Sequence, residues 1–287
     1  MSVIAQPRLD ADFDRLLELL NGRRVAVLTG AGVSTDSGIP DYRGPTSPAR
    51  NPMTYQQFVG DPVFRRRYWA RNHIGWRAMD GSRPNSGHRA LARLESMGVV
   101  TGLITQNVDL LHTKAGSRRV IDLHGTYARV RCLGCEALIS RMTLAERLDA
   151  ANPGFAADAT ASGVEGAPDA DAVIADTESF RMVDCARCGG MLKPDIVYFG
   201  ENVPKDRVAA AFDLVDDAEV LLVAGSSLTV MSGLRFVRHA AKHGRPVVII
   251  NRGPTRGDEF AALTLDVGCS TALTGLADAV AAVGGLR

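Results

Sequence analysis

The sequence has almost no excess of charge and no hydrophobic run long enough to cross a membrane. Its 287 residues include 33 lysines and arginines and 32 aspartates and glutamates, so the formal net charge is only +1. This balance argues against binding to nucleic acid or to an anionic membrane by bulk electrostatics. The first residues also lack the pattern of a signal peptide or a transit peptide. We therefore expect a cytoplasmic monomer that contacts neither membranes nor nucleic acid.

Cysteine is scarce, and its placement favours a metal site over a disulfide framework. The chain has five cysteines, and four of them form two Cys-x-x-Cys pairs, Cys132 with Cys135 and Cys185 with Cys188. Two thiolates from one tight turn reach adjacent corners of a tetrahedron, which is typical of structural zinc sites. We predict one structural zinc ion, in preference to a redox pair or unliganded thiols. The fifth, Cys269, is interpreted as a small buried hydrophobic residue.

A glycine-rich turn follows the apolar run at 25–28, where we predict a buried strand. Gly30 and Gly32 allow backbone amides to approach a phosphate, and a helix start beyond them would add a partial positive charge. The usual nucleotide motifs are incomplete, because Thr35 occupies the place of the third glycine and the Walker lysine is missing. The alternative is a plain strand-to-helix turn. The polar residues that follow the turn closely are Asp41, Tyr42 and Arg43.

Short apolar strands alternate with helices along most of the chain. We predict strands at 25–28, 99–105, 120–123, 219–224 and 246–251, and helices at 10–21, 54–79, 86–97, 231–243 and 271–283. This alternation predicts an α/β fold with a Rossmann-like parallel sheet and helices on both faces. We expect a large Rossmann-like domain at 1–44, 86–126 and 202–287. The small domain would combine a helical module, 45–85, with a zinc-ribbon module, 127–201, that contains an Ala-, Asp- and Gly-rich insertion.

Polar residues follow several of these strands where they end. The segment 105–109 follows the second strand, and its Asp109 is also able to cap the next helix. His124 leaves the third strand and is a candidate general base, although a lone histidine is more often structural. The turns 225–227 and 251–253 follow two later strands. Because the carboxyl ends of parallel strands meet at one edge, these turns together indicate a nucleotide ligand.

These motifs, in this order, resemble those of the sirtuins, which are NAD-dependent protein lysine deacylases. The resemblance covers nearly the whole chain and depends on the segments 30–34, 38–43, 105–109, 123–125, 193–201 and 225–227 and on both cysteine pairs. Details at 68–72, 112–119 and 253–256, with the long insertion, are most similar to the class II branch, which includes a mitochondrial member. The resemblance implies that NAD is consumed, that acylated-lysine proteins or peptides are the substrates, and that nicotinamide and O-acyl-ADP-ribose are released.

The resemblance also implies roles for individual residues. The diphosphate of NAD would lie on the glycine turn and Ser226, the nicotinamide near Ile39, Asn107 and Asp109, and the adenosine near Asn251 and Cys269. His124, Asn107 and Asp109 are the implied catalytic residues, and His124 would take a proton from a ribose hydroxyl. The implied NAD-binding residues are Gly30, Ala31, Gly32, Ser34, Thr35, Ile39, Asp41, Tyr42, Arg43, Gln106, Asn107, Val108, Asp109, Gly225, Ser226, Ser227, Asn251, Arg252, Gly253 and Cys269. The acyl-lysine segment would pair as a strand with Val197, Tyr198, Phe199, Gly200 and Glu201.

Tyr68 and Arg71 are candidates for selecting the acyl group. Positions three apart lie on one face of a helix, and sirtuins that remove succinyl or malonyl groups carry a Tyr-x-x-Arg of this spacing. The resemblance therefore implies that this pair binds an acidic acyl group. The alternative is that both cover the helix surface, with Arg71 paired to a nearby carboxylate. Protein mono-ADP-ribosyl transfer and a non-catalytic NAD-sensing module also stay open, although the latter predicts loss of the histidine, and His124 is present.

Overall fold

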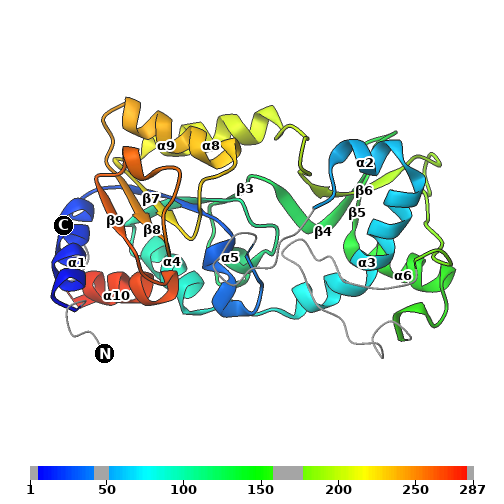
Figure 1. Ribbon diagram of the computed structural model, residues 1–287, viewed down its shortest axis with the longest axis horizontal. Coiled ribbons are helices and arrows are strands. Elements are labelled where there is room, and N and C mark those ends of the chain that lie inside the picture. The colour runs from blue at the N-terminus through cyan, green and yellow to red at the C-terminus, as the bar shows by residue number, and fades with distance from the viewer. Residues whose placement is uncertain (1–5, 42–51, 158–176, 283–287) are drawn as a thin grey trace. The chain divides into compact units, whose positions relative to one another are not determined.

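The computed structural model describes residues 6–41, 52–157 and 177–282 (Figure 1). Its internal contacts divide the chain into two compact units. Unit 1 comprises Met1–Ser47, Arg83–Leu123 and Val203–Arg287, and unit 2 comprises Pro48–Ser82 and His124–Asn202. Within the described ranges, no helix is both long and apolar enough to cross a membrane.

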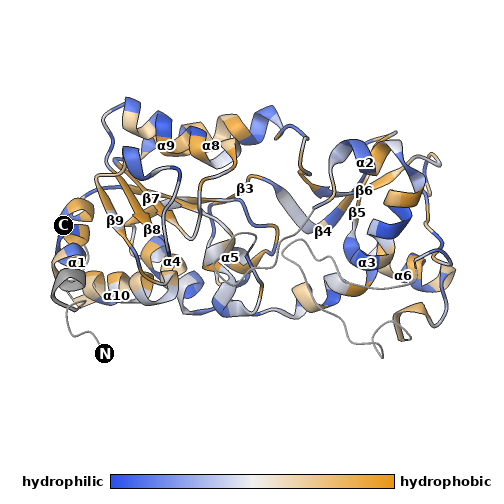
Figure 2. Ribbon diagram, in the orientation of Figure 1, coloured by the Kyte–Doolittle hydropathy of each residue, from blue (hydrophilic) through white to orange (hydrophobic). Residues whose placement is uncertain are grey.

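A parallel sheet forms the centre of unit 1, and its described part has six strands in the order β3-β2-β1-β7-β8-β9. All five neighbouring pairs are parallel. Buried parallel strands are continuous apolar runs, and β7 and β8 are accordingly hydrophobic along their length (Figure 2). The predicted parallel sheet is therefore confirmed. The strands are β1 (Val25–Thr29), β2 (Val100–Thr105), β3 (Val120–Asp122), β7 (Val220–Ala224), β8 (Val247–Ile250) and β9 (Leu263–Leu265).

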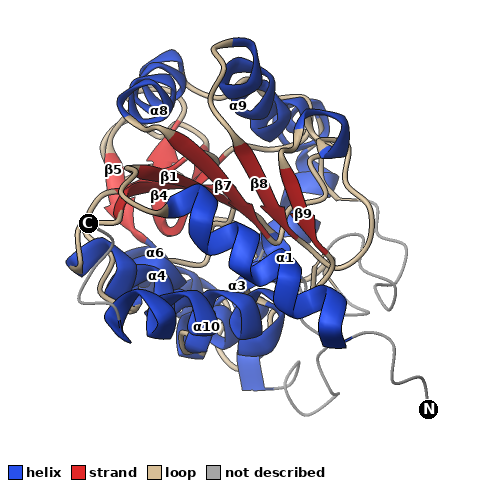
Figure 3. Ribbon diagram, turned by 90° about the vertical axis from the view of Figure 1, so that its left-hand side faces the viewer, coloured by secondary structure: helices blue, strands red, loops and turns tan. Residues whose placement is uncertain are grey.

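Helices cover both faces of this sheet, as predicted (Figure 3). Successive residues of a strand point to opposite faces. Val25 and Val27 of β1 join the core cluster of α1 (Gln6–Leu20), α4 (Ser86–Ser96) and α10 (Cys269–Ala282). Ala26 and Leu28 join the cluster of α8 (Lys205–Asp217) and α9 (Met231–Lys242). The described part of the sheet is thus buried on both faces, and ligands of such sheets bind outside the carboxyl ends of the strands.

Unit 2 contains an antiparallel sheet of three described strands in the order β5-β4-β6, together with helices α2, α3 and α6. The single helix predicted over 54–79 is two helices. Asp61 leaves the helical conformation, and its side chain accepts hydrogen bonds from the amides of Val63 and Phe64 at the start of α3. The elements are α2 (Tyr55–Gly60), α3 (Pro62–Gly81), β4 (Gly125–Cys132), β5 (Leu138–Ser140), α6 (Arg141–Ala151) and β6 (Leu192–Ile196).

The regular elements that were not predicted from the sequence are α6, α8, β4, β5, β6 and β9. The buried positions of α6 are Arg141, Leu144, Ala145 and Leu148. They have helical spacing, but the first is a charged residue, so the apolar stripe is incomplete in the sequence. The strand β9 has only three residues, which is too short for a periodic signal. The remaining one-turn elements are η1 (Ala31–Val33), η2 (Thr35–Ser37), α5 (Leu111–Lys114) and η3 (Asp258–Phe260).

Candidate functional site

The glycine turn after β1 packs directly against the turn after β7. The amide of Gly30 donates to the carbonyl of Ala224 at 3.2 Å, and the amide of Gly32 donates to that of Gly225 at 2.8 Å. A Cβ atom on Gly30 or Gly32 would lie 2.8 or 2.9 Å from the Gly225 oxygen, and one on Gly225 would lie 2.3 Å from the Val33 nitrogen. Gly225 also has a left-handed φ of 65°. Only glycine permits this contact between two backbones.

The turn continues into the single-turn 3₁₀ helices η1 and η2, in place of the short α-helix that was expected there. The amides of Val33 and Ser34 donate to the carbonyls of Gly30 and Ala31 at 3.1 and 3.0 Å. Together with the two glycine amides, four amides of this turn are therefore engaged inside unit 1. The glycines have a packing role that needs no ligand, and the binding of a diphosphate here stays a prediction.

A buried polar cluster joins this turn to the segment that follows β2. Ser34 donates to Asp109 Oδ2 at 2.7 Å, and Asn107 Nδ2 donates to Ser34 Oγ at 3.1 Å and to the carbonyl of Gly30 at 3.0 Å. The amide oxygen of Asn107 is thereby turned away from Ser34. The tertiary structure brings together three residues that the sequence places in separate motifs.

Asp109 is held in a strained setting. It is only 3% exposed, and burial raises the pKa of its carboxyl group. Its Oδ1 accepts from the amide of Leu111 at 2.9 Å, while Leu110 between them has a φ of 59°. A non-glycine residue in this region costs of order 1–3 kcal/mol. Asp109 thus holds the start of α5 with one oxygen and faces Ser34 with the other, so the capping interpretation and the site interpretation are compatible.

Gln106 and Ser226 link the segment after β2 to the turn after β7. Ser226 Oγ donates to Gln106 Oε1 at 2.7 Å, and Ser226 Oγ accepts from the amide of Leu228 at 3.3 Å. In the strand order, β2 and β3 lie on one side of β1 and β7, β8 and β9 lie on the other, so the strand order reverses beside β1. Ligands of open parallel sheets bind at such a switch point, outside the carboxyl ends of the strands.

Two buried histidines lie beside this cluster and were not singled out from the sequence. His88 Nε2 is 3.4 Å from Ser34 Oγ, His112 Nε2 is 2.9 Å from Thr29 Oγ1, and the two rings are 4.8 Å apart. Burial lowers the pKa of His88 to about 4 and that of His112 to about 3. Both are therefore neutral near pH 7. A sequence signal for His88 does exist, because Asn85 and His88 form an Asn-x-x-His capping box at the start of α4.

The turn after β8 and the start of α10 lie next to each other. Asn251 Nδ2 donates to the carbonyls of Arg252 and Gly253 at 2.9 and 3.1 Å, and Gly253 N donates to Asp266 Oδ1 at 2.9 Å. Cys269 is 6% exposed, its Sγ is 3.7 Å from the carbonyl oxygen of Ile250, and burial raises its pKa to about 12. It is a neutral buried thiol, as interpreted from the sequence.

Five other predicted NAD-binding residues are among the described residues. Thr35 Oγ1 donates to the carbonyl of Gly32 at 3.1 Å, and Ser227 Oγ is 3.1 Å from Thr229 Oγ1. Ile39 is buried. The half-buried residues are Asp41 and Val108. Tyr42 and Arg43 lie outside the described residues.

In unit 2, the predicted peptide-binding segment 197–201 is held next to the backbone of His124. Val197 N donates to the carbonyl of His124 at 2.8 Å. Glu201 Oε2 accepts from Tyr198 N at 2.9 Å and lies 3.1 Å from the buried ammonium of Lys193. Burial lowers the pKa of this lysine, and the Glu201 carboxylate opposes the change. The turn is therefore held by an ion pair between a buried lysine and a half-buried glutamate.

Tyr68 lies in an aromatic cluster of unit 2. Its ring centroid is 5.5 Å from that of Phe58, 5.6 Å from that of Trp69 and 5.4 Å from that of Tyr198. The structure thus brings a predicted acyl-selecting residue against a residue of the predicted peptide-binding segment. Arg71, one turn further along α3, is half-buried.

The four paired cysteines are positioned to bind one zinc ion. Their Sγ atoms all lie within 4.8 Å of one another, with Cys132 to Cys188 at 3.5 Å and Cys135 to Cys185 at 3.8 Å. Thiolates about 2.3 Å from a tetrahedral zinc ion are about 3.8 Å apart, so the observed spacing fits this metal. A Cβ on Gly190 would lie 3.0 Å from two of these sulfurs, and its amide donates to Cys188 Sγ at 3.3 Å.

Comparison with known proteins places the chain in a family. The model of the Sir2 family matches residues 30–232. The chain is 69% identical to "NAD-dependent protein deacetylase 1" of Mycobacterium avium (strain 104), over 93% of this chain and 95% of the relative. It is 52% identical to the protein of the same name from Streptomyces coelicolor, over 93% and 89% of the two chains. The chain therefore belongs to the Sir2 family, the sirtuins.

Solved structures agree with this assignment. A structure described as "Structural Basis for the Mechanism and Regulation of Sir2 Enzymes" has a TM-score of 0.76 and 27% sequence identity, covering 96% of this chain and 99% of that chain. The complex "Sir2-p53 peptide-NAD+" has a TM-score of 0.74 and 31% identity over the same shares. The resemblance inferred from the motifs is thus confirmed at the level of fold and family.

Proposed function

We propose that this chain is an NAD-dependent protein lysine deacylase that releases nicotinamide and O-acyl-ADP-ribose. The observation that carries the proposal is the polar cluster of Ser34, Asn107 and Asp109 at the switch point of a parallel sheet, in a chain of the Sir2 family. Relatives at 69% and 52% identity are named NAD-dependent protein deacetylases. A related structure is described with a p53 peptide and NAD+.

In this proposal the residues of unit 1 bind NAD. The turns after β1 and β7 flank the diphosphate, and the Asn251 turn with Cys269 receives the adenosine. Ile39, Asn107 and Asp109 surround the nicotinamide. The hydrogen bonds of Ser34 to Asn107 and Asp109 support this assignment, because they hold both side chains in place. In the first step nicotinamide leaves with the electrons of its bond to the ribose, and Asp109 would hold the cationic ring in place in a dry pocket until it leaves. The remaining predicted contacts, including Tyr42 and Arg43, belong to the same proposal.

The proposed general base is His124. It would accept the proton of a ribose hydroxyl, so that this oxygen attacks the intermediate formed when the acyl oxygen displaces nicotinamide. Supporting this role, the His124 carbonyl accepts from Val197 N, which ties the histidine backbone to the predicted peptide-binding segment. The acyl-lysine peptide would pair with 197–201 through main-chain hydrogen bonds, which give affinity without strict sequence preference.

We further propose that Tyr68 and Arg71 select an acidic acyl group such as succinyl or malonyl. The guanidinium of Arg71 would bind the terminal carboxylate, and the Tyr68 hydroxyl would donate to it. A hydrogen bond to a charged group contributes roughly 1.5–3 kcal/mol, so the preference over acetyl would be about 10- to 150-fold. The contact of Tyr68 with Tyr198 supports a location close to the bound peptide.

The experiment that tests the proposal incubates the protein with NAD and matched acetyl-, succinyl- and malonyl-lysine peptides. Mass spectrometry follows nicotinamide, deacylated peptide and O-acyl-ADP-ribose, with a His124→Ala variant as the matched control. Formation of all three products by the wild type alone is expected. Nicotinamide release with ADP-ribose attached to the peptide would instead favour mono-ADP-ribosyl transfer. Absence of nicotinamide release despite NAD binding would favour a non-catalytic NAD-sensing module.

The acyl preference has its own test. Arg71→Ala is expected to lose about 10- to 150-fold in kcat/KM for the succinyl peptide and to keep its activity on the acetyl peptide. A wild type that prefers acetyl, or a variant that loses both activities equally, would contradict the acidic-acyl proposal. The cytoplasmic location and the monomeric state belong to the proposal as well, and light scattering of the purified protein tests the latter.

A further inference from the structure

Arg141 is a buried cation at the first residue of α6. It is 2% exposed, and among the described residues no carboxylate forms an ion pair with it. Its guanidinium lies 4.8 Å from the ring centroid of Trp76 and 5.8 Å from that of Trp69. Burial of a cation is costly, and the start of a helix is also an unfavourable place for one. The remaining contacts of Arg141 therefore have to offset an unfavourable position.

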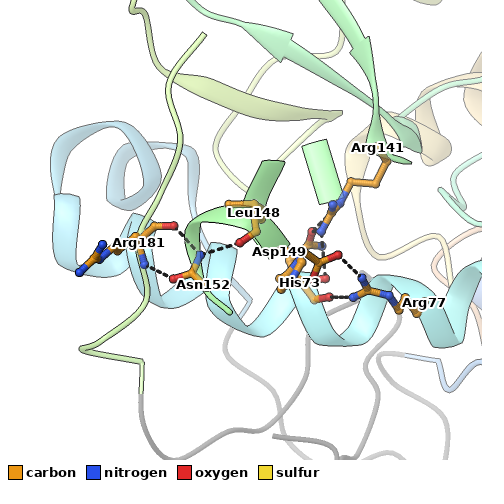
Figure 4. A network of polar contacts seen from close by, with 8 residues as sticks. His73, Arg77, Arg141, Leu148, Asp149, Asn152 and Arg181 are labelled. Carbon is orange, nitrogen blue, oxygen red and sulfur yellow. Dashed lines mark hydrogen bonds and ion pairs between the residues drawn. The ribbon is translucent and has the colours of Figure 1, made fainter. Parts of the chain in front are cut away.

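Asp149 is the carboxylate whose charge opposes the lowering of the pKa of Arg141 by burial, and it is already engaged by other residues. Asp149 Oδ1 is 2.9 Å from His73 Nε2, and Asp149 Oδ2 is 2.8 Å from Arg77 Nη2 (Figure 4). Both partners come from α3, whereas Asp149 and Arg141 come from α6. With the carboxylate occupied, the hydrogen bonds of Arg141 go to Asn72 instead.

Asn72 lies between Arg141 and Tyr68. Arg141 Nε and Nη2 donate to Asn72 Oδ1 at 3.2 and 3.1 Å, and Nη2 also donates to the Asn72 carbonyl at 3.4 Å. On its other side, Asn72 Nδ2 donates to the Tyr68 hydroxyl at 3.4 Å. Asn72 is 3% exposed and Tyr68 is 2% exposed, so solvent does not compete strongly for these bonds.

The donor and acceptor of each hydrogen bond from Arg141 through Asn72 to Tyr68 follow from the chemistry of Arg141. A guanidinium has five donors and no acceptor, so the amide oxygen of Asn72 must face it. The NH2 group of Asn72 must then face Tyr68, where the phenol oxygen accepts. A phenol has one proton, and Asn72 has no acceptor left on this side, so that proton is directed away from Asn72.

We infer that Arg141 is a positioning residue for acyl selection, which acts through Asn72 to direct the Tyr68 hydroxyl proton toward the acyl carboxylate. The inference rests on the proposed function of Tyr68. It assigns the selectivity to residues outside the Tyr-x-x-Arg motif. In a sirtuin that has the Tyr-x-x-Arg motif but lacks the Asn72 and Arg141 pair, the phenol proton would not be directed toward the acyl carboxylate.

Asn72→Asp tests the inference, because it keeps the shape of the side chain and its bond to Arg141. It replaces the NH2 donor by a carboxylate oxygen, which captures the Tyr68 proton. We expect a loss of roughly 10- to 150-fold in kcat/KM for the succinyl peptide, mainly through KM, with little change for the acetyl peptide. Thermal stability should be kept, because the Arg141 contact becomes an ion pair. An unchanged succinyl-to-acetyl ratio would overturn the inference.

Two further variants distinguish the relay, by which we mean the hydrogen bonds from Arg141 through Asn72 to Tyr68, from a general packing effect. Tyr68→Phe should lose the same factor as Asn72→Asp, and the double variant should lose no more than either. Full additivity of the two losses would overturn the inference. Asn152→Asp is the matched control, because Asn152 is the C-cap of α6 and bonds to Leu148 and Arg181 but forms no hydrogen bond with Tyr68 (Figure 4). It should keep the succinyl-to-acetyl ratio.

A readout without catalysis distinguishes failure of the inference from failure of the proposed acyl preference. The protein is labelled with fluorotyrosine, and the ¹⁹F resonance of residue 68, among five tyrosines, is identified by its absence in Tyr68→Phe. In Asn72→Asp this resonance should move upfield, because the phenol now donates to a carboxylate. An unmoved resonance overturns the relay whatever the enzyme's acyl preference is. A moved resonance in an enzyme that prefers acetyl supports the relay and refutes only the acyl proposal.

Discussion

Acidification should destabilise unit 1 through His88 and His112. Both rings are less than 2% exposed, and their folded-state pKa values are about 4 and about 3 against 6.5 in the unfolded chain. A histidine with a lowered folded-state pKa binds more protons when unfolded. Its neutral form therefore stabilises the fold above pH 6.5, and this stability is lost as the pH falls from 6.5 toward 4.

The magnitude follows from these pKa values. At pH 5 the unfolded imidazole is almost fully protonated while the folded one is neutral, so each histidine lowers the free energy of unfolding by about 2 kcal/mol relative to pH 7.5. The two together would lower it by about 4 kcal/mol. A domain has only about 5–15 kcal/mol of stability in total, so the effect is large enough to measure without ambiguity.

The assay combines NMR titration with urea denaturation followed by circular dichroism. The C–H resonances of His88 and His112, assigned with His→Asn variants, should not titrate between pH 7.5 and 5. His112→Asn should lose about 2 kcal/mol less than the wild type between these pH values. The control is His243→Asn, which removes an exposed histidine of the same unit. Titration of either buried ring near pH 6.5, or an unchanged pH dependence in His112→Asn, would refute the reasoning.

Three other predictions concern the metal, the base and the glycine contact. Cys132→Ala with Cys188→Ala should abolish zinc binding and destabilise unit 2; about one retained zinc per chain in metal analysis would contradict the site. His124→Ala should lower deacylation by roughly 10²- to 10⁴-fold, with nicotinamide exchange less affected, whereas equal loss of both would indicate an earlier or merely structural role. Gly225→Ala should lower the free energy of unfolding, measured by urea denaturation, by about 2–4 kcal/mol. The loss should exceed that of Gly98→Ala, because Gly98 has a similar φ of 78° but a Cβ atom there would have no atom within 4 Å. Equal losses would show that φ alone matters.

Much of the architecture was predictable because its signals are local. The strands β1, β7 and β8 are continuous apolar runs, and each ends within one residue of its predicted end. The helix break at Asp61 was missed although it has a local signal, because Asp61 is a capping residue followed directly by Pro62 at the first helical position. The zinc site was predictable from the two Cys-x-x-Cys turns, since each turn fixes the spacing of its own thiolates.

The sequence by itself thus determined five of the six described strands of the parallel sheet, most helices, the metal ligands and the family. Only the tertiary structure decided which polar groups meet, because those contacts join segments far apart in the chain. Ser34 meets Asp109 across 75 positions, and Arg141 meets Asn72 across 69. Burial of Arg141 and of the histidine pair likewise depends on elements packed around them, not on neighbours in sequence. Local pattern specifies local conformation, whereas hydrogen-bond direction and pKa are set by the surroundings that folding assembles.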